Sequence, residues 1–229
     1  MNELHYIESG ADNGRVMLLL HGNGEDGGYF GAQLGFFGSR YHVIAPDTPG
    51  QGESPRGEGE YTLGRFADDL CDFMDAHNID KAVLLGFSDG ANIALCFALK
   101  YPSRVERLIL NGGNLDPSGV KPSVQLPILI GWRIARLFSR FSEGARAKTE
   151  LLGLMVEQPH IDPRELHKIK IPTLVIAGTR DMIKDSHTRL IAASIPGAKL
   201  KILEGDHFIA NRAPRHFNLA VEEFLDGRD

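Results

Sequence analysis

Six short runs of apolar, β-favouring residues recur along the chain, and each is followed by a turn and a segment with helical periodicity. The runs begin at Val16, His42, Ala82, Arg107, Thr173 and Lys199. Strands that are apolar on both sides are buried on both faces, as in a parallel sheet covered by helices. The alternation therefore predicts an α/β fold, with a mostly parallel central sheet flanked by helices.

About sixty residues between the fourth and fifth runs carry no strand pattern and contain two helical stretches, residues 126–141 and 143–158. The first is apolar over much of its circumference, which favours a helix packed on other helices over a cavity. We therefore expect residues 114–169 to form a helical cap inserted into a core made of residues 1–113 and 170–229. A long crossover connection is the alternative.

Composition limits the classes of function. The 229 residues are 42% hydrophobic and carry a net charge of −5 that is scattered along the chain, which gives no basic field for nucleic acid. No apolar run reaches the roughly 20 residues of a membrane span, and the first ten residues contain no apolar signal core. We expect a cytoplasmic monomer or homodimer with a small-molecule substrate, no membrane or nucleic-acid partner, and Cys71 and Cys96 as buried thiols.

The segment HGNGEDGG, residues 21–28, follows the first apolar run and resembles a glycine-rich phosphate cradle. It has neither the GxGxxG spacing of a dinucleotide-binding loop nor the GK[ST] ending of a P-loop. Its glycines still allow the backbone to approach a ligand. We expect no cofactor and no metal.

The motif that carries chemistry is Gly86-Phe87-Ser88-Asp89-Gly90, which matches GxSxG between an apolar strand and a helical run. In a nucleophile elbow the serine occupies a strained turn, and small residues two positions away on either side avoid collisions. Ser88 would project at the helix N-terminus, where the Asp89 N–H and the helix dipole favour negative charge on a substrate oxygen. The alternative is a serine that only caps the helix.

A serine hydroxyl needs a histidine base and an acid that orients the histidine. His207 follows the last apolar run and Asp181 follows the run before it, so the order Ser88, Asp181, His207 is the one typical of this elbow. Asp206 and Asp185 compete as the acid, although Asp206 is adjacent to His207 and would reach its imidazole poorly. Asp181 could instead cap a helix, and His207 could be a core histidine.

The chain thus resembles the α/β-hydrolase family over nearly its full length. The matching segments are HGNG, APDTPGQGES at residues 45–54, GFSDG, and the pair GTRD and EGDH. The resemblance implies an oxyanion hole made by the backbone N–H groups of Asn23 and Asp89. It also implies structural rather than catalytic roles for His21, Asp47 and Ser54.

A serine nucleophile argues against dehalogenase and epoxide hydrolase chemistry, which use an aspartate at the elbow. The resemblance implies a carboxylesterase that cleaves small or medium esters through an acyl-enzyme on Ser88. Carbon–carbon bond hydrolysis, lactone opening and cofactor-free perhydrolysis are alternative reactions of the same triad. A ligand-binding protein without turnover is an alternative of another class.

The elbow is also similar to that of valacyclovir-hydrolase-like enzymes, which reads GWSDG and whose aspartate binds the α-amino group of the substrate. By this resemblance Asp89 binds a substrate amine, although Phe87 replaces the tryptophan and the cap is short. An acidic residue in the first turn of a helix is favourable whatever the substrate. Candidates for the pocket wall are Trp132, foremost, and Phe138, Met155 and His160.

Overall fold

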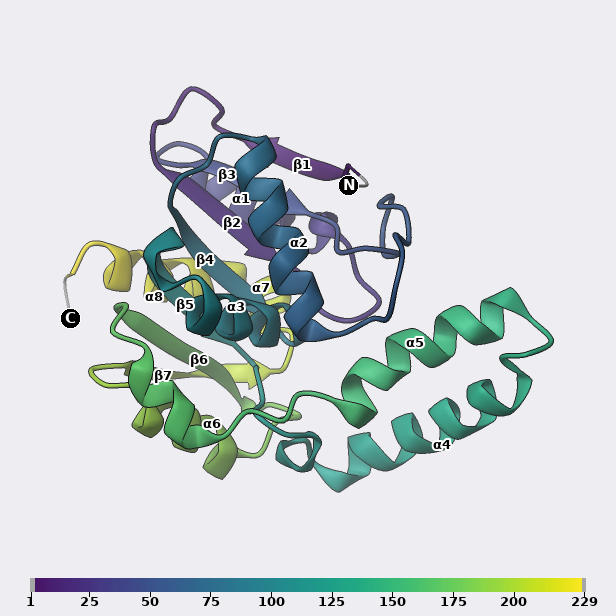
Figure 1. Cartoon of the computed structure of the whole chain (residues 1–229). Helices are drawn as coiled ribbons and strands as arrows, with labels where there is room; N and C mark the ends of the chain where they lie inside the picture. Colours follow the sequence, from purple (N-terminus) through teal and green to yellow (C-terminus); the bar gives the residue numbers. More distant parts are fainter. Residues whose placement is uncertain (1–2, 228–229) are drawn as a thin grey trace.

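The computed structural model describes residues 3–227, which form a seven-stranded sheet with helices on both faces (Figure 1). The strand order is β1-β3-β2-β4-β5-β6-β7. The strands are β1 Tyr6–Ser9, β2 Val16–Leu20, β3 His42–Pro46, β4 Ala82–Phe87, β5 Val105–Asn111, β6 Thr173–Arg180 and β7 Lys199–Asp206. Only the pairing of β1 with β3 is antiparallel. The predicted mostly parallel sheet is confirmed, while β1 escaped sequence detection because Glu8 and Ser9 interrupt its apolar character.

Alternate residues of the central strands enter two separate cores, which is why these strands are apolar throughout. In β2, Leu18 and Leu20 face one core, and Met17 and Leu19 face the other; all four are fully buried. Helices α2, α3 and α6 cover the first face, and α1, α7 and α8 cover the second. These helices are α1 Gly31–Phe37, α2 Leu63–Ala76, α3 Asp89–Lys100, α6 Asp185–Ser194, α7 Ile209–Arg212 and α8 Pro214–Leu225. Short 3-10 helices complete the chain: η1 Gly27–Phe30, η2 Pro102–Arg104, η3 Pro117–Gly119 and η4 Pro163–Lys168.

The parallel strands place their carboxyl ends along one edge of the sheet. The residues that follow β2, β4, β6 and β7 include His21, Ser88, Asp181 and His207, respectively. Because crevices at this edge are where α/β sheets bind ligands, the topology alone gathers the residues singled out from the sequence.

The remaining helices, α4 Pro122–Phe138 and α5 Glu143–Glu157, form a hairpin that projects away from the sheet (Figure 1). Residues on either side of the hairpin, Leu115, Leu166 and Ile169, are buried in the core, as is Leu154 near the end of α5. The expectation that the first stretch packs among helices over a cavity is wrong. Helix α4 packs on α5 through Trp132 and leaves its other apolar side in water.

No helix among residues 3–227 is both long enough and apolar enough to cross a membrane. Cys71 and Cys96 are free thiols.

Candidate active site

Ser88 occupies the turn between β4 and α3 with a φ of 53°, a conformation that non-glycine residues rarely adopt. Its N–H donates to the Asn111 carbonyl of β5 over 2.8 Å, which fixes the turn to the sheet. A Cβ on Gly86 would lie 2.2 Å from the Gly90 carbonyl oxygen, and a Cβ on Gly90 would lie 2.0 Å from that of Leu20. The close packing of strand and helix therefore requires both glycines of the motif.

Asp181 and His207 meet as a buried pair. The His207 Nδ1 lies 2.7 Å from Asp181 Oδ1, and both side chains are less than 5% exposed. The Ile183 N–H donates to the same carboxyl oxygen over 2.9 Å. Burial would raise the pKa of Asp181, but the hydrogen bond and charge interaction with His207, helped by backbone N–H groups, hold that pKa below its usual value.

The other ring nitrogen of His207, Nε2, is buried and has no hydrogen-bond partner among the described residues. The ring lies against Phe87, the residue before Ser88, with centroids 4.8 Å apart. A Cβ on Gly112 would lie 2.7 Å from the His207 ring, so only glycine fits at this position, where its φ is 65°. An imidazole in this position has one nitrogen oriented by a carboxylate and the other available for a proton.

The competing acids are engaged elsewhere. The Asp206 carboxylate accepts from the Phe208 N–H and pairs with Arg212. The Asp185 carboxylate pairs with Arg189 over 2.8 Å on the outer surface of α6. Of the three candidate acids, only Asp181 hydrogen-bonds to His207.

The backbone N–H groups of Asn23 and Asp89 donate to no other described residue, which leaves both available to a ligand. The Asp89 N–H is the first of α3, where the helix dipole favours negative charge. The Asn23 side chain has a separate role: its amide donates to Asp89 Oδ2 over 2.9 Å and to the Leu151 carbonyl of α5 over 2.8 Å. It thereby ties the loop after β2 to both the elbow and the hairpin.

The Asp89 carboxylate is buried against amides. Besides Asn23, the Asn92 amide approaches it at 3.4 Å, and Asn92 in turn binds Asn114 at the start of the inserted segment. Burial raises the pKa of Asp89, and the two amides only partly oppose that shift. The carboxylate thus braces the loop after β2 against α3.

The loop at residues 45–54 is organised by Asp47 and His21. The Asp47 carboxylate accepts from the N–H groups of Gly27 and Glu53, at 2.7 and 2.9 Å, and lies 2.8 Å from the His5 ring. The His21 ring Nδ1 donates to the Gly22 carbonyl, and its Nε2 accepts from the Thr48 N–H. The Ser54 hydroxyl donates to the Asp47 carbonyl. All three residues therefore hold loops together, as expected from the sequence.

Sequence reasoning missed Glu25 and Tyr29. The half-buried Glu25 carboxylate accepts from the Gly22 N–H over 3.2 Å, and burial raises its pKa while the charge of His207 opposes the shift. The Tyr29 ring stacks on Phe87 with centroids 4.4 Å apart. The signal for Glu25 was its place two residues after Asn23 in HGNGE; Tyr29 lies outside every motif.

The residues proposed for a pocket wall make their observed contacts within the inserted segment; the Met155 carbonyl, for example, accepts from the Gln125 amide of α4 over 3.0 Å. The Trp132 indole lies against Gly153 of α5, with Arg136 over its ring, so its contacts are within the hairpin. Phe138 is exposed near the far end of α4, and His160 pairs with Asp116 over 2.7 Å. None of these contacts supports Trp132 as a substrate-binding residue.

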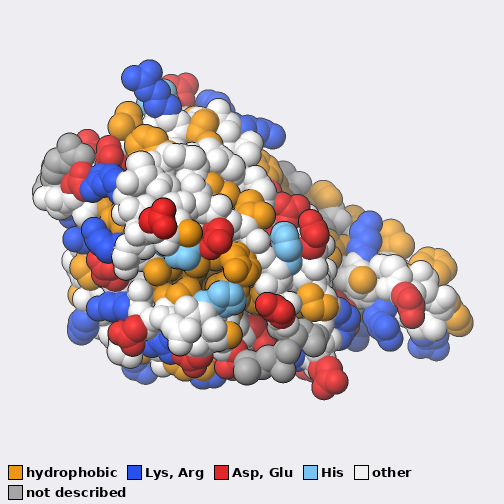
Figure 2. Space-filling model, turned by 90° about the horizontal axis from the view of Figure 1, so that it is seen from above, with side chains coloured by type: hydrophobic (Ala, Val, Ile, Leu, Met, Phe, Trp, Pro, Cys, Tyr) orange, Lys and Arg blue, Asp and Glu red, His pale blue; other side chains and the backbone are white. Residues whose placement is uncertain are grey.

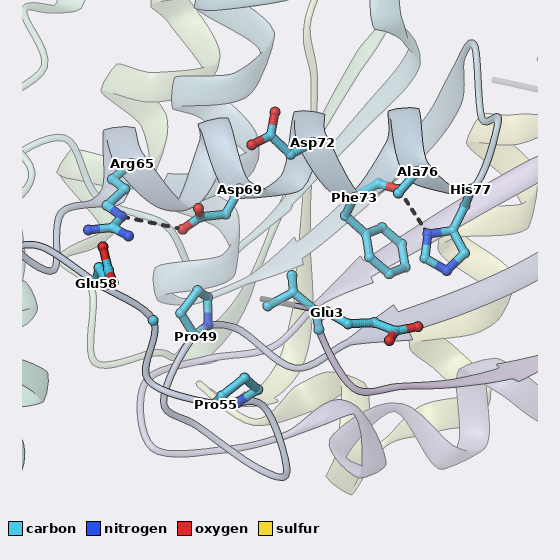
Figure 3. A pocket seen from close by; sticks show the side chains of 12 residues that line it. Glu3, Pro49, Pro55, Glu58, Arg65, Asp69, Asp72, Phe73, Ala76 and His77 are labelled. Atoms are coloured by element: carbon cyan, nitrogen blue, oxygen red, sulfur yellow. Dashed lines mark hydrogen bonds and ion pairs between the residues drawn. The ribbon is translucent and has the colours of Figure 1, made fainter. Parts of the chain in front are cut away.

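A cavity of about 640 Å³ lies away from the triad, between α2 and the loop that contains Pro49 and Pro55 (Figure 3). Its lining is rich in carboxylates, those of Glu3, Glu58, Asp69 and Asp72. Arg65 lies 3.7 Å from Asp69, and the His77 ring binds the Phe73 carbonyl. The cavity contains no serine or cysteine beside a base. Among the described residues, no group of three or more His, Cys, Asp or Glu could hold a metal ion.

The comparisons with known proteins identify the family of the fold. A family model described as the alpha/beta hydrolase fold matches residues 15–150. The human serine hydrolase BPHL is 29% identical, over 97% of this chain and 83% of its own length. A crystal structure of a hydrolase from Pseudomonas aeruginosa is 30% identical over 97% of this chain and 94% of its own, with a TM-score of 0.77. The enol-lactonase of Burkholderia xenovorans is 25% identical over 98% and 97% of the two chains, with a TM-score of 0.80. The chain therefore belongs to the α/β-hydrolase family.

Proposed function

We propose that this protein is a serine hydrolase of carboxylic esters, with Ser88 as nucleophile, His207 as general base and Asp181 as the acid that orients it. The observation that carries the proposal is the buried 2.7 Å contact between His207 Nδ1 and Asp181, which leaves Nε2 unpartnered beside the elbow. A carboxylate at Nδ1 holds a triad imidazole in the tautomer whose Nε2 can take a proton.

In the proposed reaction the Ser88 hydroxyl attacks the ester carbonyl carbon while His207 Nε2 takes its proton. The resulting oxyanion lies in the hole formed by the N–H groups of Asn23 and Asp89. Collapse expels the alcohol, which receives the proton from His207, and leaves an acyl-serine. Water then attacks the acyl carbon, again deprotonated by His207, and the acid leaves as Ser88 regains its proton.

The oxyanion hole contributes on the same scale as the base. Removing one donor from such a hole typically costs on the order of 3 kcal/mol of transition-state stabilisation. The amide contacts of Asn23 with Asp89 and Leu151 hold the loop that carries one donor, so these contacts support the reaction without touching substrate.

Lactone opening is the second candidate, because the enol-lactonase of Burkholderia xenovorans matches nearly the whole chain. A lactone is an internal ester, and the same steps would release a hydroxy acid instead of two products. Comparing open esters with lactones and thioesters of matched acyl length would separate these substrate classes.

The proposal is tested with Ser88→Ala on p-nitrophenyl acetate and butyrate. Removing a triad nucleophile typically lowers kcat by about 10⁴- to 10⁶-fold, and we expect a loss of this size with little change in the midpoint of thermal unfolding. The matched control is Ser123→Ala, which removes an exposed hydroxyl from α4. Retention of full activity by the Ser88 variant would disprove the triad.

A fluorophosphonate probe separates the nucleophile from the choice of substrate. The probe should phosphonylate Ser88 in the wild type, with the adduct located by mass spectrometry of the elbow peptide. Labelling without turnover of any ester would keep the nucleophile and redirect the search to other carbonyl substrates. If the probe does not label Ser88 and no ester is hydrolysed, the result would favour a ligand-binding protein.

A further inference from the structure

Helix α4 exposes a row of large hydrophobic side chains, two of which, Ile134 and Phe138, also border a hollow between α4 and the start of α5. These side chains recur at helical spacing, and the last of them lies just past the end of α4. They are Leu126, Ile130, Ile134, Leu137, Phe138 and Phe141, here called the α4 stripe. Each is between 50% and 79% exposed. Monomeric proteins rarely leave contiguous apolar surface of this kind in water, and where they do it commonly marks a docking surface.

Positive charge surrounds the stripe. Residues 133–148 contain Arg133, Arg136, Arg140, Arg146 and Lys148 but a single acidic residue, Glu143. None of these five cations pairs with a carboxylate among residues 3–227. The Arg140 guanidinium lies over the ring of Phe141, so apolar and cationic groups share one surface. Figure 2 shows the hairpin from above, projecting at the right, with hydrophobic, Lys or Arg, and Asp or Glu side chains on that face.

The charge on this end of the hairpin opposes that of the whole chain, which carries −5. An anionic surface would therefore attract the hairpin end and repel the rest of the molecule, which orients the approach. A helix with an apolar face bordered by arginines is typical of helices that lie in the plane of a membrane interface. The hairpin also stands clear of the sheet, so a flat surface can reach it (Figure 1).

We propose that the α4–α5 hairpin docks on anionic lipid membranes, with the α4 stripe in the acyl boundary and the surrounding arginines on the headgroups. The expectation of no membrane partner came from the lack of a spanning segment, and peripheral docking needs none. A second copy of the chain fits less well. Packed antiparallel on the same stripe, it would bring the Arg133, Arg136 and Arg140 rows together with no carboxylate between them.

The test is co-sedimentation of the full chain with vesicles of phosphatidylcholine alone and with 30% phosphatidylserine. We expect binding to the anionic vesicles that weakens with salt. Each basic residue near such a surface contributes about a fivefold change in partitioning, so Arg133→Gln with Arg140→Gln should weaken binding by about 25-fold. The matched pair Lys170→Gln with Arg215→Gln removes exposed charges elsewhere and should leave binding within about fivefold of wild type.

The apolar part is tested with Leu126→Ser and Leu137→Ser together, against Leu190→Ser and Leu219→Ser, which change exposed leucines of α6 and α8. Only the first pair should abolish vesicle binding, and thermal unfolding checks that both pairs fold. Equal binding to neutral vesicles, or none to either kind, would overturn the proposal. So would a dimer in sedimentation velocity that the stripe variants dissociate while vesicles bind nothing. These measurements do not depend on the activity of Ser88.

Discussion

The edge of the sheet where the parallel strands end and the α4–α5 hairpin differ in whether their side chains have partners within the chain. At the edge, most buried polar side chains have partners within the chain: Asp181 binds His207, Asp89 binds Asn23, and His21 binds Thr48, while His207 Nε2 has none. On the hairpin, large apolar side chains and unpaired cations face water. Contacts inside the molecule therefore order the first region, whereas the proposed membrane contact would cover the second.

The α4 stripe is large enough for its exposure to matter for the stability of the fold. Burying a leucine, isoleucine or phenylalanine side chain stabilises a fold by about 1.5–3 kcal/mol. Leaving six of them in water forgoes an amount comparable with the whole net stability of an ordinary domain, about 5–15 kcal/mol. The outer side of α4 therefore contributes little to folding, whereas α5 joins the core through the buried Leu154 and contacts the loop after β2 through Leu151.

The largest expected effect belongs to the buried carboxylate. Asp181→Asn would place an amide beside His207 Nδ1 and favour the tautomer with its proton on Nε2, where the serine proton must go. By analogy with other triads kcat should fall by about 10⁴-fold. Asp162→Asn, which changes an exposed carboxylate paired with Arg164, should change kcat by less than about twofold. Equal kcat values for both variants on p-nitrophenyl butyrate would remove Asp181 from the triad.

Replacing a helical glycine by alanine should change the free energy of unfolding in opposite directions in the two regions. Gly90→Ala would place a Cβ 2.0 Å from the Leu20 carbonyl oxygen, and we expect it to lower the free energy of unfolding by more than about 3 kcal/mol. The same change at Gly131 of α4 meets only Leu152 at 3.7 Å and should raise that free energy by up to about 1 kcal/mol through helix propensity. Urea denaturation measures the free energy of unfolding of both variants. Similar changes in the two variants would contradict the difference in packing between the regions.

Asp89→Asn tests the junction between the regions. An amide here can accept from Asn23 or from Asn92 but not from both, so the loop that carries the Asn23 N–H should loosen. One hydrogen bond to a charged group is worth about 1.5–3 kcal/mol, and we expect kcat/KM to fall by about tenfold or more on alanine methyl ester and methyl propionate alike. A loss confined to the alanine ester would instead show that Asp89 binds a substrate amine. Asp185→Asn, at the corresponding first position of α6, is the control.

The sequence predicted what local chemistry dictates. GFSDG identified the elbow because two glycines and a strained serine are needed wherever a strand turns at once into a packed helix. Ser88, Asp181 and His207 could be expected at one edge because each follows a strand of a parallel sheet.

What sequence patterns could not give is the partner of an apolar face. Periodicity in α4 reveals two apolar sides but not that Trp132 faces α5 while Ile130 and Ile134 face water. The bridge from the Asn23 amide to the Leu151 carbonyl joins residues 128 positions apart, and no local signal encodes it. The inserted segment was identified from its lack of strands, but its direction depends on such long-range contacts.

The smallest predicted effect is a pH dependence of stability that separates two histidines. Burial lowers the pKa of both His21 and His187, whose Nε2 atoms accept from the N–H groups of Thr48 and Leu115. A depressed histidine pKa stabilises the fold above the unfolded value of about 6.5, and this stability is lost as pH falls. The free energy of unfolding should therefore decline below pH 6.5, by at most about 1.4 kcal/mol per pH unit for each histidine.

His21 is fully buried at the site edge, whereas the half-buried His187 supports the chain leading to the hairpin, so His21→Asn should flatten the decline more than His187→Asn. Urea unfolding between pH 5 and 7.5 measures how the free energy of unfolding changes with pH in each variant. If His187→Asn flattened the decline more than His21→Asn, the segment leading to the hairpin would be at least as well ordered as the site.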